Sequence, residues 1–185
     1  MGKEFIVTVF GSSRPREGDP DYEEARVLGR ALAKHGLLVC SGGYGGVMEA
    51  VSRGAKEAGG KTTGVTADFF KAAKLNAWID VEVRMKTWEE RLFELIRRAD
   101  GFVACKGGTG TLVELAVVWE MLNKSVMTAK PFAVLGDFWQ PVLDRVREVE
   151  VGHPAPWGEA NGRLVYVATS PGDVASHLTM KLKQS

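Results

Sequence analysis

The sequence predicts an α/β protein with a Rossmann-like, doubly wound and mainly parallel sheet of about seven strands and helices on both faces. Short apolar runs rich in β-branched residues alternate along the chain with amphipathic segments of helical length. Two of these runs end in glycine-rich turns from which a helix starts at once. No repeat of fixed period and no linker divides the chain, so we expect residues 1–185 to form a single domain.

Residues typical of helix caps and turns indicate where the predicted helices begin. Proline follows Asp19 at one predicted helix start, and Thr87 with Glu90 has the spacing of a capping box. Residues 67–76 are expected to form a short helix or a loop. The predicted strands are 5–10, 37–40, 62–66, 78–83, 102–105, 132–135 and 164–168; the predicted helices are 20–36, 47–58, 88–99, 112–120, 139–149 and 171–182; residues 151–162 are predicted to be a long irregular loop.

The composition gives no sign of nucleic-acid or membrane binding. Lys and Arg number 24 against 23 Asp and Glu, so no net field attracts a polyanion. Cys40 and Cys105 lie in apolar runs without metal-ligand or disulfide spacing, which indicates small buried side chains in a reducing compartment. The start lacks a signal-peptide pattern, and no stretch has transmembrane length. We therefore expect a soluble, cytoplasmic protein that holds no metal.

The strongest functional pattern follows the predicted strand at 102–105. Glycines at 107, 108 and 110 alternate with Thr109 and Thr111 directly before a helical pattern. A strand, a turn and a helix N-terminus in this order aim free backbone N–H groups at an anion. Glycine lets that anion approach the backbone closely. We expect the turn to bind phosphate through Gly107, Gly108, Thr109, Gly110 and Thr111.

Glu114 lies in the first turn of that predicted helix and has two explanations. Residues 111–114 fit a capping box, in which Thr111 caps the helix and Glu114 reaches back to the Thr111 N–H. A carboxylate in a first turn also suits the helix dipole. The alternative is a chemical role beside the bound anion, for which a carboxylate is not otherwise needed. The spacing alone leaves both explanations open.

Two other predicted strand ends offer ligand contacts. Residues 42–46 contain four glycines in five positions before a helix, which exceeds the need of a plain turn, although tight packing of helix on strand is the alternative. At the end of the first strand, serine hydroxyls and backbone amides would bind phosphate or ribose, or form an ordinary turn. The candidate contacts are Gly42, Gly43 and Met48, and Gly11, Ser12 and Ser13.

Arg91 is the candidate cation of this edge. It lies just inside the helix opened by Thr87, and helices of a wound sheet begin at the edge where ligands bind. We therefore expect it near both glycine turns. The alternative is a weak, solvated i,i+3 pair with Glu94.

Together these motifs resemble the LOG ("lonely guy") family, whose members were long labelled possible lysine decarboxylases. The resemblance rests on FGSS at 10–13, SGGYGGVMEA at 41–50, AGG at 58–60 and GGTGTLVE at 107–114, and covers the chain to about Leu135. It implies a Rossmann-like nucleotide-binding domain that forms a homodimer or higher homo-oligomer. It also implies hydrolysis of the N-glycosidic bond of nucleoside 5′-monophosphates, such as AMP or cytokinin ribotides, to free base and ribose 5-phosphate, without a cofactor.

The same resemblance assigns roles to individual residues. It makes Glu114 the catalytic glutamate and Arg91 the catalytic arginine. Exposed faces at Trp88 or Trp119 would fit the expected dimer. The 5′-phosphate is assigned to Gly107, Gly108, Gly110 and Thr111.

Three positions depart from the LOG pattern. Lys106 replaces a proline, which loosens the turn or adds a cation beside the phosphate, and Leu92 replaces a lysine. Glu49 stands where LOG members usually carry glycine and is more similar to the molybdenum-cofactor-carrier branch, which binds a phosphorylated pterin without hydrolysing it. The departures favour the alternative function, a non-catalytic nucleotide- or pterin-binding protein. Lysine decarboxylation is excluded because no setting exists for a Schiff-base lysine and a pyridinium partner.

Overall fold

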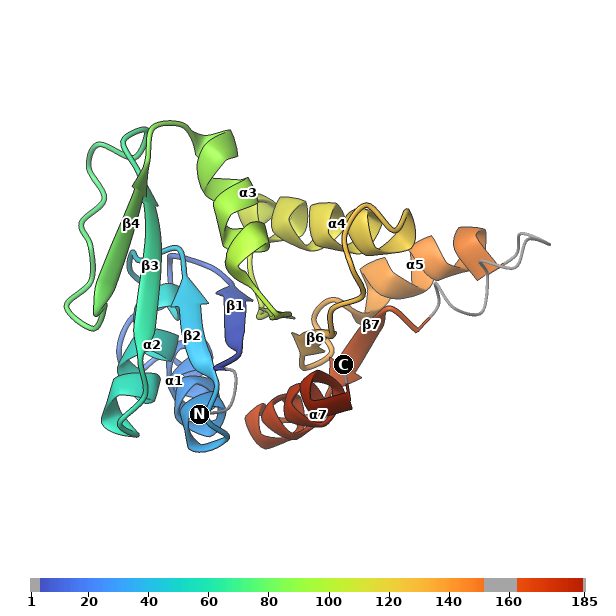
Figure 1. Cartoon of the computed structure of the whole chain (residues 1–185), viewed down its shortest axis with the longest axis horizontal. Helices are drawn as coiled ribbons and strands as arrows, with labels where there is room; N and C mark the ends of the chain where they lie inside the picture. Colours follow the sequence, from blue (N-terminus) through green and yellow to red (C-terminus); the bar gives the residue numbers. More distant parts are fainter. Residues whose placement is uncertain (1–3, 152–162, 185) are drawn as a thin grey trace.

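The computed structural model of the chain describes residues 4–151 and 163–184. Within them lies a seven-stranded sheet of order β4-β3-β2-β1-β5-β6-β7, in which every neighbouring pair is parallel (Figure 1). The predicted fold class is confirmed. The elements are β1 (Ile6–Phe10), α1 (Pro20–Lys34), β2 (Leu38–Ser41), α2 (Val47–Glu57), β3 (Thr62–Ala67), β4 (Val81–Met85), α3 (Trp88–Arg98), β5 (Gly101–Ala104), α4 (Thr109–Asn123), β6 (Phe132–Leu135), α5 (Gln140–Val151), β7 (Val165–Ala168) and α7 (Pro171–Gln184).

The central strands are continuous apolar runs because both of their faces are covered. Every residue of β5 and β6 is buried, as expected for parallel strands between two helix layers. Most residues of β4, which lies at the edge of the sheet, are exposed to solvent. β3, which is less apolar than the central strands, is the next strand in from β4.

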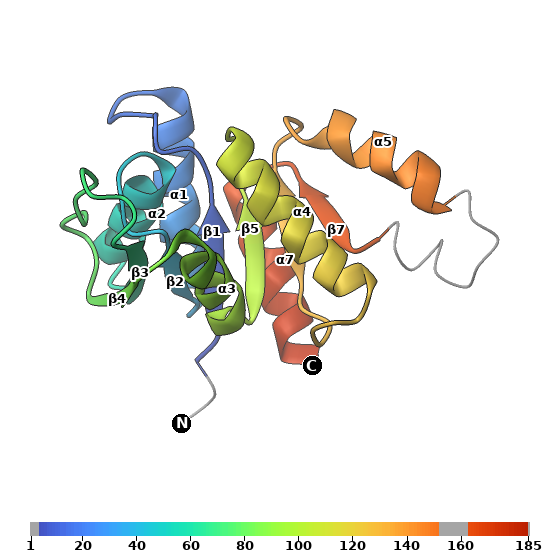
Figure 2. The same ribbon diagram turned by 90° about the horizontal axis from the view of Figure 1, so that it is seen from above.

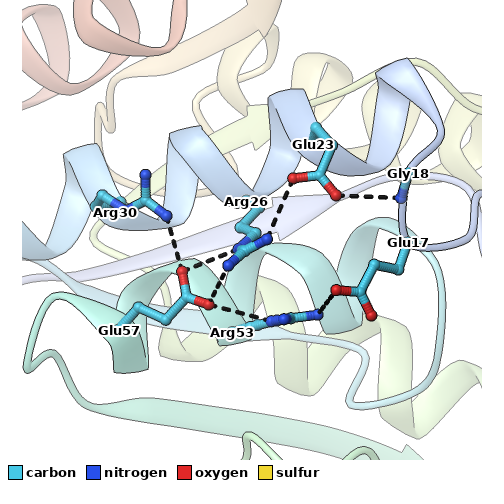
Figure 3. Close-up of polar contacts among 7 residues, drawn as sticks. All are labelled: Glu17, Gly18, Glu23, Arg26, Arg30, Arg53 and Glu57. Atoms are coloured by element: carbon cyan, nitrogen blue, oxygen red, sulfur yellow. Dashed lines mark hydrogen bonds and ion pairs between the residues drawn. The ribbon is translucent and has the colours of Figure 1, made fainter.

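Helices cover both faces of the sheet. One core is built beneath α1, α2 and α7, and the other beneath α3, α4 and α5 (Figures 1 and 2). α1 and α2 pack unusually closely, since a Cβ at Gly29 or Gly54 would overlap the backbone of the facing helix. A charged cluster joins the same two helices: the Glu57 carboxylate accepts from Arg26, Arg30 and Arg53 (Figure 3).

The winding of the chain reverses between β1 and β5. From β1 the chain passes to α1 on one face, and from β5 it passes to α4 on the other. The carboxyl ends of these two neighbouring strands therefore send their connections apart, and doubly wound sheets bind ligands at such a reversal. The turns after β1, β2 and β5 all reach this edge.

The loop alternative for residues 67–76 is found, two other expectations need correction, and one falls outside the described residues. Residues 68–80 link β3 to β4 by turns without a helix. The fourth strand is β4, three residues later than its predicted start. Trp119 is only 7% exposed, because it faces the core of α3 and α4 and offers no exposed face for a dimer. The predicted long loop lies almost wholly at residues 152–162, outside the described residues.

Candidate functional site

The turn between β5 and α4 is an open helix N-terminus. Gly108 is the N-cap of α4 and provides no side-chain cap. Among the described residues, no acceptor is found for the backbone N–H groups of residues 107–111. Gly108, Thr109 and Gly110 are also exposed. Five unpaired donors at the positive end of a helix dipole form a ready site for an anion.

The three glycines of this turn have different reasons to be glycine. A Cβ at Gly107 would overlap the side chain of Thr111, which is buried against it. Gly108 and Gly110 face open space, and neither has a positive φ. No packing contact or backbone strain therefore requires glycine at these two positions. They leave the approach to the N–H groups clear.

The capping box expected at Thr111 and Glu114 does not form. α4 begins at Thr109, two residues before Thr111, so Thr111 lies inside the helix and Glu114 in its second turn. The helix starts earlier because Gly108 already adopts the extended backbone of an N-cap. The structural explanation of Glu114 is thereby removed.

Glu114 is a partly buried carboxylate without a hydrogen bond. It makes no hydrogen bond or ion pair with any described residue. Burial raises the pKa of Glu114 to about 7, and the positive charge of Arg91 opposes this rise. A carboxyl group with this pKa exchanges its proton near neutral pH, as a general acid or base must.

Arg91 is the cation that acts on Glu114, and it is held in place by uncharged groups. The predicted capping box of Thr87 and Glu90 opens α3. One turn on, Arg91 is 7% exposed, with Nε donating to the Val65 carbonyl at 2.8 Å and Nη2 to the Gly42 carbonyl at 3.2 Å. Burial lowers the pKa of Arg91, although a guanidinium remains charged at neutral pH.

The expected position of Arg91 near the second glycine turn is found, and the alternative pairing is not. Glu94 accepts instead from Arg97 and Arg98. Because the guanidinium of Arg91 has no carboxylate within ion-pair distance among the described residues, its charge is not neutralised. It is available to an anionic ligand or to Glu114.

The glycine turn after β2 makes room for this arginine. A Cβ at Gly42 would overlap the guanidinium of Arg91 and the sulfur of Met48, and that sulfur lies 3.8 Å from Arg91 Nη2. Gly43 has φ +77°, a conformation that favours glycine. Packing thus accounts for Gly42 and Gly43. Their contact with a nucleotide, and that of Met48, stays a prediction.

The end of β1 lies between the two glycine turns. Ser12 donates its N–H to the Lys106 carbonyl at 3.3 Å and accepts from the Val47 N–H at 2.8 Å. A Cβ at Gly11 would overlap Val47. Ser13 is exposed. The structure therefore brings the predicted residues of all three strand ends to one edge.

Lys106, the residue in place of the family's proline, directs its charge to α1. Its Nζ lies 3.0 Å from Oδ2 of Asp21 and 6.0 Å from the centre of the Phe138 ring. The expected cation beside the phosphate is thus already paired with a carboxylate. The ion pair anchors the β5–α4 turn to the first turn of α1.

Aromatic side chains around Arg91 were missed by the sequence analysis. The guanidinium carbon lies 5.4 Å from the ring centre of Tyr44 and 5.5 Å from that of Phe70. Beyond Phe70 lies a cavity of about 780 Å³, walled by Phe69, Phe70 and Trp88. The available signal was the pair of phenylalanines in a segment with no helical or strand period, one of which, Phe69, is 66% exposed.

Two negative findings apply to the described residues. They contain no group of three or more His, Cys, Asp or Glu side chains able to hold a metal ion. No helix among them combines the length and apolar character needed to span a bilayer.

Comparison with known proteins identifies the family. Residues 4–150 match the model of the SLOG cluster4 family. The chain belongs to this family. Its similarity to LOG proteins, inferred from the glycine motifs, is thereby confirmed.

Curated relatives of this SLOG cluster4 protein include LOG enzymes. The chain is 34% identical over 145 residues to the cytokinin riboside 5′-monophosphate phosphoribohydrolase LOG of Oryza sativa subsp. japonica, across 75% of this chain and 58% of the rice protein. It is 36% identical over 135 residues to the enzyme of the same name from Mycobacterium marinum, across 69% and 72% of the two chains. An uncharacterised protein of Archaeoglobus fulgidus is 30% identical over 121 residues, across 64% and 78%.

Solved structures similar to this SLOG cluster4 protein include molybdenum-cofactor proteins. The molybdenum cofactor binding protein of Rippkaea orientalis is 25% identical, with a TM-score of 0.74 over 99% of each chain. The molybdenum cofactor carrier protein of Chlamydomonas reinhardtii, 22% identical with a TM-score of 0.71 over 99% and 100% of the chains, has the same fold.

Proposed function

We propose that this protein hydrolyses the N-glycosidic bond of a purine nucleoside 5′-monophosphate and releases the free base and ribose 5-phosphate. One observation carries the proposal: Glu114, a carboxyl group of pKa about 7 with no hydrogen-bond partner among the described residues, stands on the helix whose N-terminus presents five unpaired N–H groups. An anion site and a titrating acid share α4. The curated LOG relatives have the corresponding enzyme name.

In this proposal the turn holds the 5′-phosphate and Arg91 holds the sugar side of the ligand. The N–H groups of residues 107–111 bind the phosphoryl oxygens. The buried, unneutralised guanidinium of Arg91 fixes the ribose relative to the carboxylate of Glu114. Positioning of this kind is a large part of the catalytic effect expected for a hydrolase that uses one acid–base group.

Glu114 performs the chemical step. Breaking the bond between C1′ and the base nitrogen sends the electron pair to the base and leaves positive charge on the ribose ring. The ionised carboxylate stabilises that charge and takes a proton from the water whose oxygen bonds to C1′. A proton is added to the departing base, so that the water is divided between the ribose and the base and the carboxylate is restored. The ionised form is therefore the active form.

The aromatic cavity beside Arg91 is the proposed site of the base. Phe70 contacts Arg91 and lines the cavity, so a base bound there would lie near Arg91. Because stacking of a base on an aromatic ring is worth about 1–3 kcal/mol, we expect Phe69→Ala to raise KM for AMP about tenfold and leave kcat nearly unchanged. Phe93→Ala, which removes an exposed ring of α3 away from the cavity, is the control. Steady-state kinetics with an unchanged KM would exclude Phe69 from the base site.

The test of the function is direct. Purified protein is incubated with AMP, and the products are separated by chromatography. We expect adenine and ribose 5-phosphate in equal amounts, with no release by Glu114→Gln. Recovery of intact AMP from the wild-type protein would refute the proposal.

The second candidate is a binding protein for a phosphorylated pterin or nucleotide. It is favoured by the full-length similarity to the molybdenum cofactor binding protein of Rippkaea orientalis and by Glu49 and Leu92, which depart from the LOG pattern. The same incubation separates the two candidates. Tight binding of AMP, seen by calorimetry, together with intact ligand would support the binding protein.

A further inference from the structure

A second cavity lies on the opposite helix layer from Arg91 and Glu114. It has a volume of about 270 Å³ and opens between the loop after β1, at residues 13–17, and the start of α2. Tyr22 of α1 and Glu49 of α2 form part of its wall. α1 and α2 cover one face of the sheet, whereas α3 and α4 cover the other (Figure 2).

The start of α2 provides unpaired donors to this cavity. Gly46 is its N-cap and offers no side chain. The Val47 N–H donates to the Ser12 carbonyl, but no acceptor is found among the described residues for the N–H groups of Gly45, Gly46, Met48 or Glu49. Gly45 and Gly46 line the cavity.

Two arginines of the cavity have free guanidinium groups. Arg14 and Arg16 line it, both are exposed, and neither guanidinium has a partner among the described residues. Their neighbours on this layer differ: Arg26, Arg30 and Arg53 are bound by Glu57, Glu23 and Glu17 (Figure 3). The Glu17 carboxylate, 2.7 Å from Arg53, is thus already paired.

Tyr22 adds a buried hydroxyl to the wall of the cavity. Its side chain is 2% exposed, and its oxygen has no hydrogen-bond partner of normal geometry among the described residues. Arg53 and Glu49 lie near enough for their charges to act on the pKa of Tyr22, which burial raises. Hydrogen bonding to Arg53 and Glu49 also acts on the pKa of Tyr22, so these two side chains are the groups nearest to its hydroxyl.

Glu49 determines which anion fits. Its carboxylate lies over the start of its own helix, where a Cβ at Gly45 would come within 3.9 Å of Oε2. It repels a bare phosphate, but it accepts hydrogen bonds from hydroxyl groups. A ligand with a phosphoryl group for the arginines and N–H groups, and hydroxyls for Glu49, satisfies both.

We propose that this cavity is a second ligand site, which binds a small phosphorylated sugar with its phosphoryl group on Arg14, Arg16 and the start of α2 and its hydroxyls on Glu49. The volume is slightly below the usual range for small-molecule pockets, so the ligand is of the size of a sugar phosphate and not of a whole nucleotide. The site does not depend on the proposed hydrolysis.

The test is a calorimetric titration of the full chain with ribose 5-phosphate. We expect two sites in the wild-type protein and one in the double variant Arg14→Gln, Arg16→Gln. A matched double variant, Arg30→Gln with Arg145→Gln, removes the same charge from residues outside the cavity and should keep two sites. Gly110→Ala, in the β5–α4 turn, should weaken the other site.

Replacing Glu49 should change the affinities for inorganic phosphate and for ribose 5-phosphate in opposite directions. Glu49→Gln should bind phosphate several-fold more tightly at this cavity, because the repulsion is gone, and ribose 5-phosphate more weakly. A number of ribose 5-phosphate sites that is unchanged by loss of Arg14 and Arg16 would overturn the proposal. A single wild-type site that disappears with these two arginines would support it and would count only against binding at the β5–α4 turn. Absence of AMP hydrolysis would overturn the proposed function alone.

Discussion

Glu114 carries most of the proposed chemistry because it is a partly buried carboxylate on whose pKa a single cation, Arg91, acts. Its pKa of about 7 results from burial, with Arg91 opposing the shift. A carboxylate paired directly with an arginine would have a lowered pKa and would be a poor base at neutral pH. The separation of the two charges is therefore functional in the proposed mechanism.

The first prediction at the residue scale concerns the rate. Glu114→Gln should keep AMP binding but lose at least ~10²-fold in turnover, the usual scale for one acid–base group. In the wild-type protein kcat/KM should rise with pH through about 7, because the base must be ionised. A pH–rate profile that is flat from 6 to 8 would contradict the role of Glu114.

The second prediction concerns stability. The pKa of Glu114 is raised from its ordinary value of 4.5 to about 7 in the folded protein, so its contribution to stability is present at low pH and lost as pH rises through 7. Glu114→Gln should thus be more stable than wild type at pH 8 by on the order of 2 kcal/mol, with no such gain at pH 4.5. Denaturant unfolding at both values measures this. Glu120→Gln, an exposed site on the same helix, should show no pH-dependent difference.

At the scale of the element, α4 combines a stable helix with an open beginning. Its interior packs on the core through Leu115, Val118 and Trp119, while its first turn has no cap. Such an end is normally satisfied by a side chain or by solvent. Here the room around Gly108 and Gly110 keeps it open to a ligand.

This arrangement predicts opposite effects on stability and binding. Gly110→Ala fills no occupied space and replaces glycine in a helix, so it should stabilise the protein by a few tenths to about 1 kcal/mol. The added methyl group should weaken phosphate or AMP binding at the turn about tenfold. Thermal unfolding and calorimetry check the two parts. Gly107→Ala, whose methyl group would overlap Thr111, should instead be less stable.

At the scale of the whole molecule, the reversal of the winding places the strand ends. β1 is hydrogen-bonded to both β2 and β5, so the turns after all three strands meet at one edge. One helix layer carries Arg91 and Glu114, and the other carries the cavity at Tyr22. The proposed two sites are separated by the loop after β1.

The layer of α1 and α2 depends on the cluster around Glu57. Hydrogen bonds from Arg26, Arg30 and Arg53 hold the pKa of Glu57 at about 2, below its ordinary value of 4.5, with Arg26 the largest contributor. This contribution to stability is present above pH 4.5 and is lost as pH falls toward 2. Glu57→Gln should therefore lower the free energy of unfolding at pH 7 by on the order of 1 kcal/mol, a value reduced by solvent screening.

The measurement for Glu57 is urea unfolding between pH 7 and pH 2. The difference from wild type should shrink as the pH falls. Glu148→Gln, which removes a single exposed pair with Arg145, is the control and should have almost no effect. A difference for Glu57→Gln that is the same at both ends of the range would show that packing, and not charge, is lost.

The sequence alone determined the order of the elements and the class of the fold. Continuous apolar runs such as residues 102–105 are typical of parallel strands that are covered on both faces. The glycine turns mark the carboxyl ends of these strands, where the chain passes into the next helix. The same patterns predicted that Arg91 lies at the carboxyl edge of the sheet, where both glycine turns lie. They also indicated the LOG family, which the comparisons confirmed.

The tertiary structure decided what each residue at that edge touches. Whether Glu114 caps α4 depends on where the helix begins, and that depends on the backbone of Gly108. The partners of Lys106, the rings around Arg91 and the free guanidinium groups of Arg14 and Arg16 are contacts between segments distant in the chain. Periodicity and spacing report local preference, whereas burial and pairing, which set the pKa of Glu114, arise when the sheet brings these segments together.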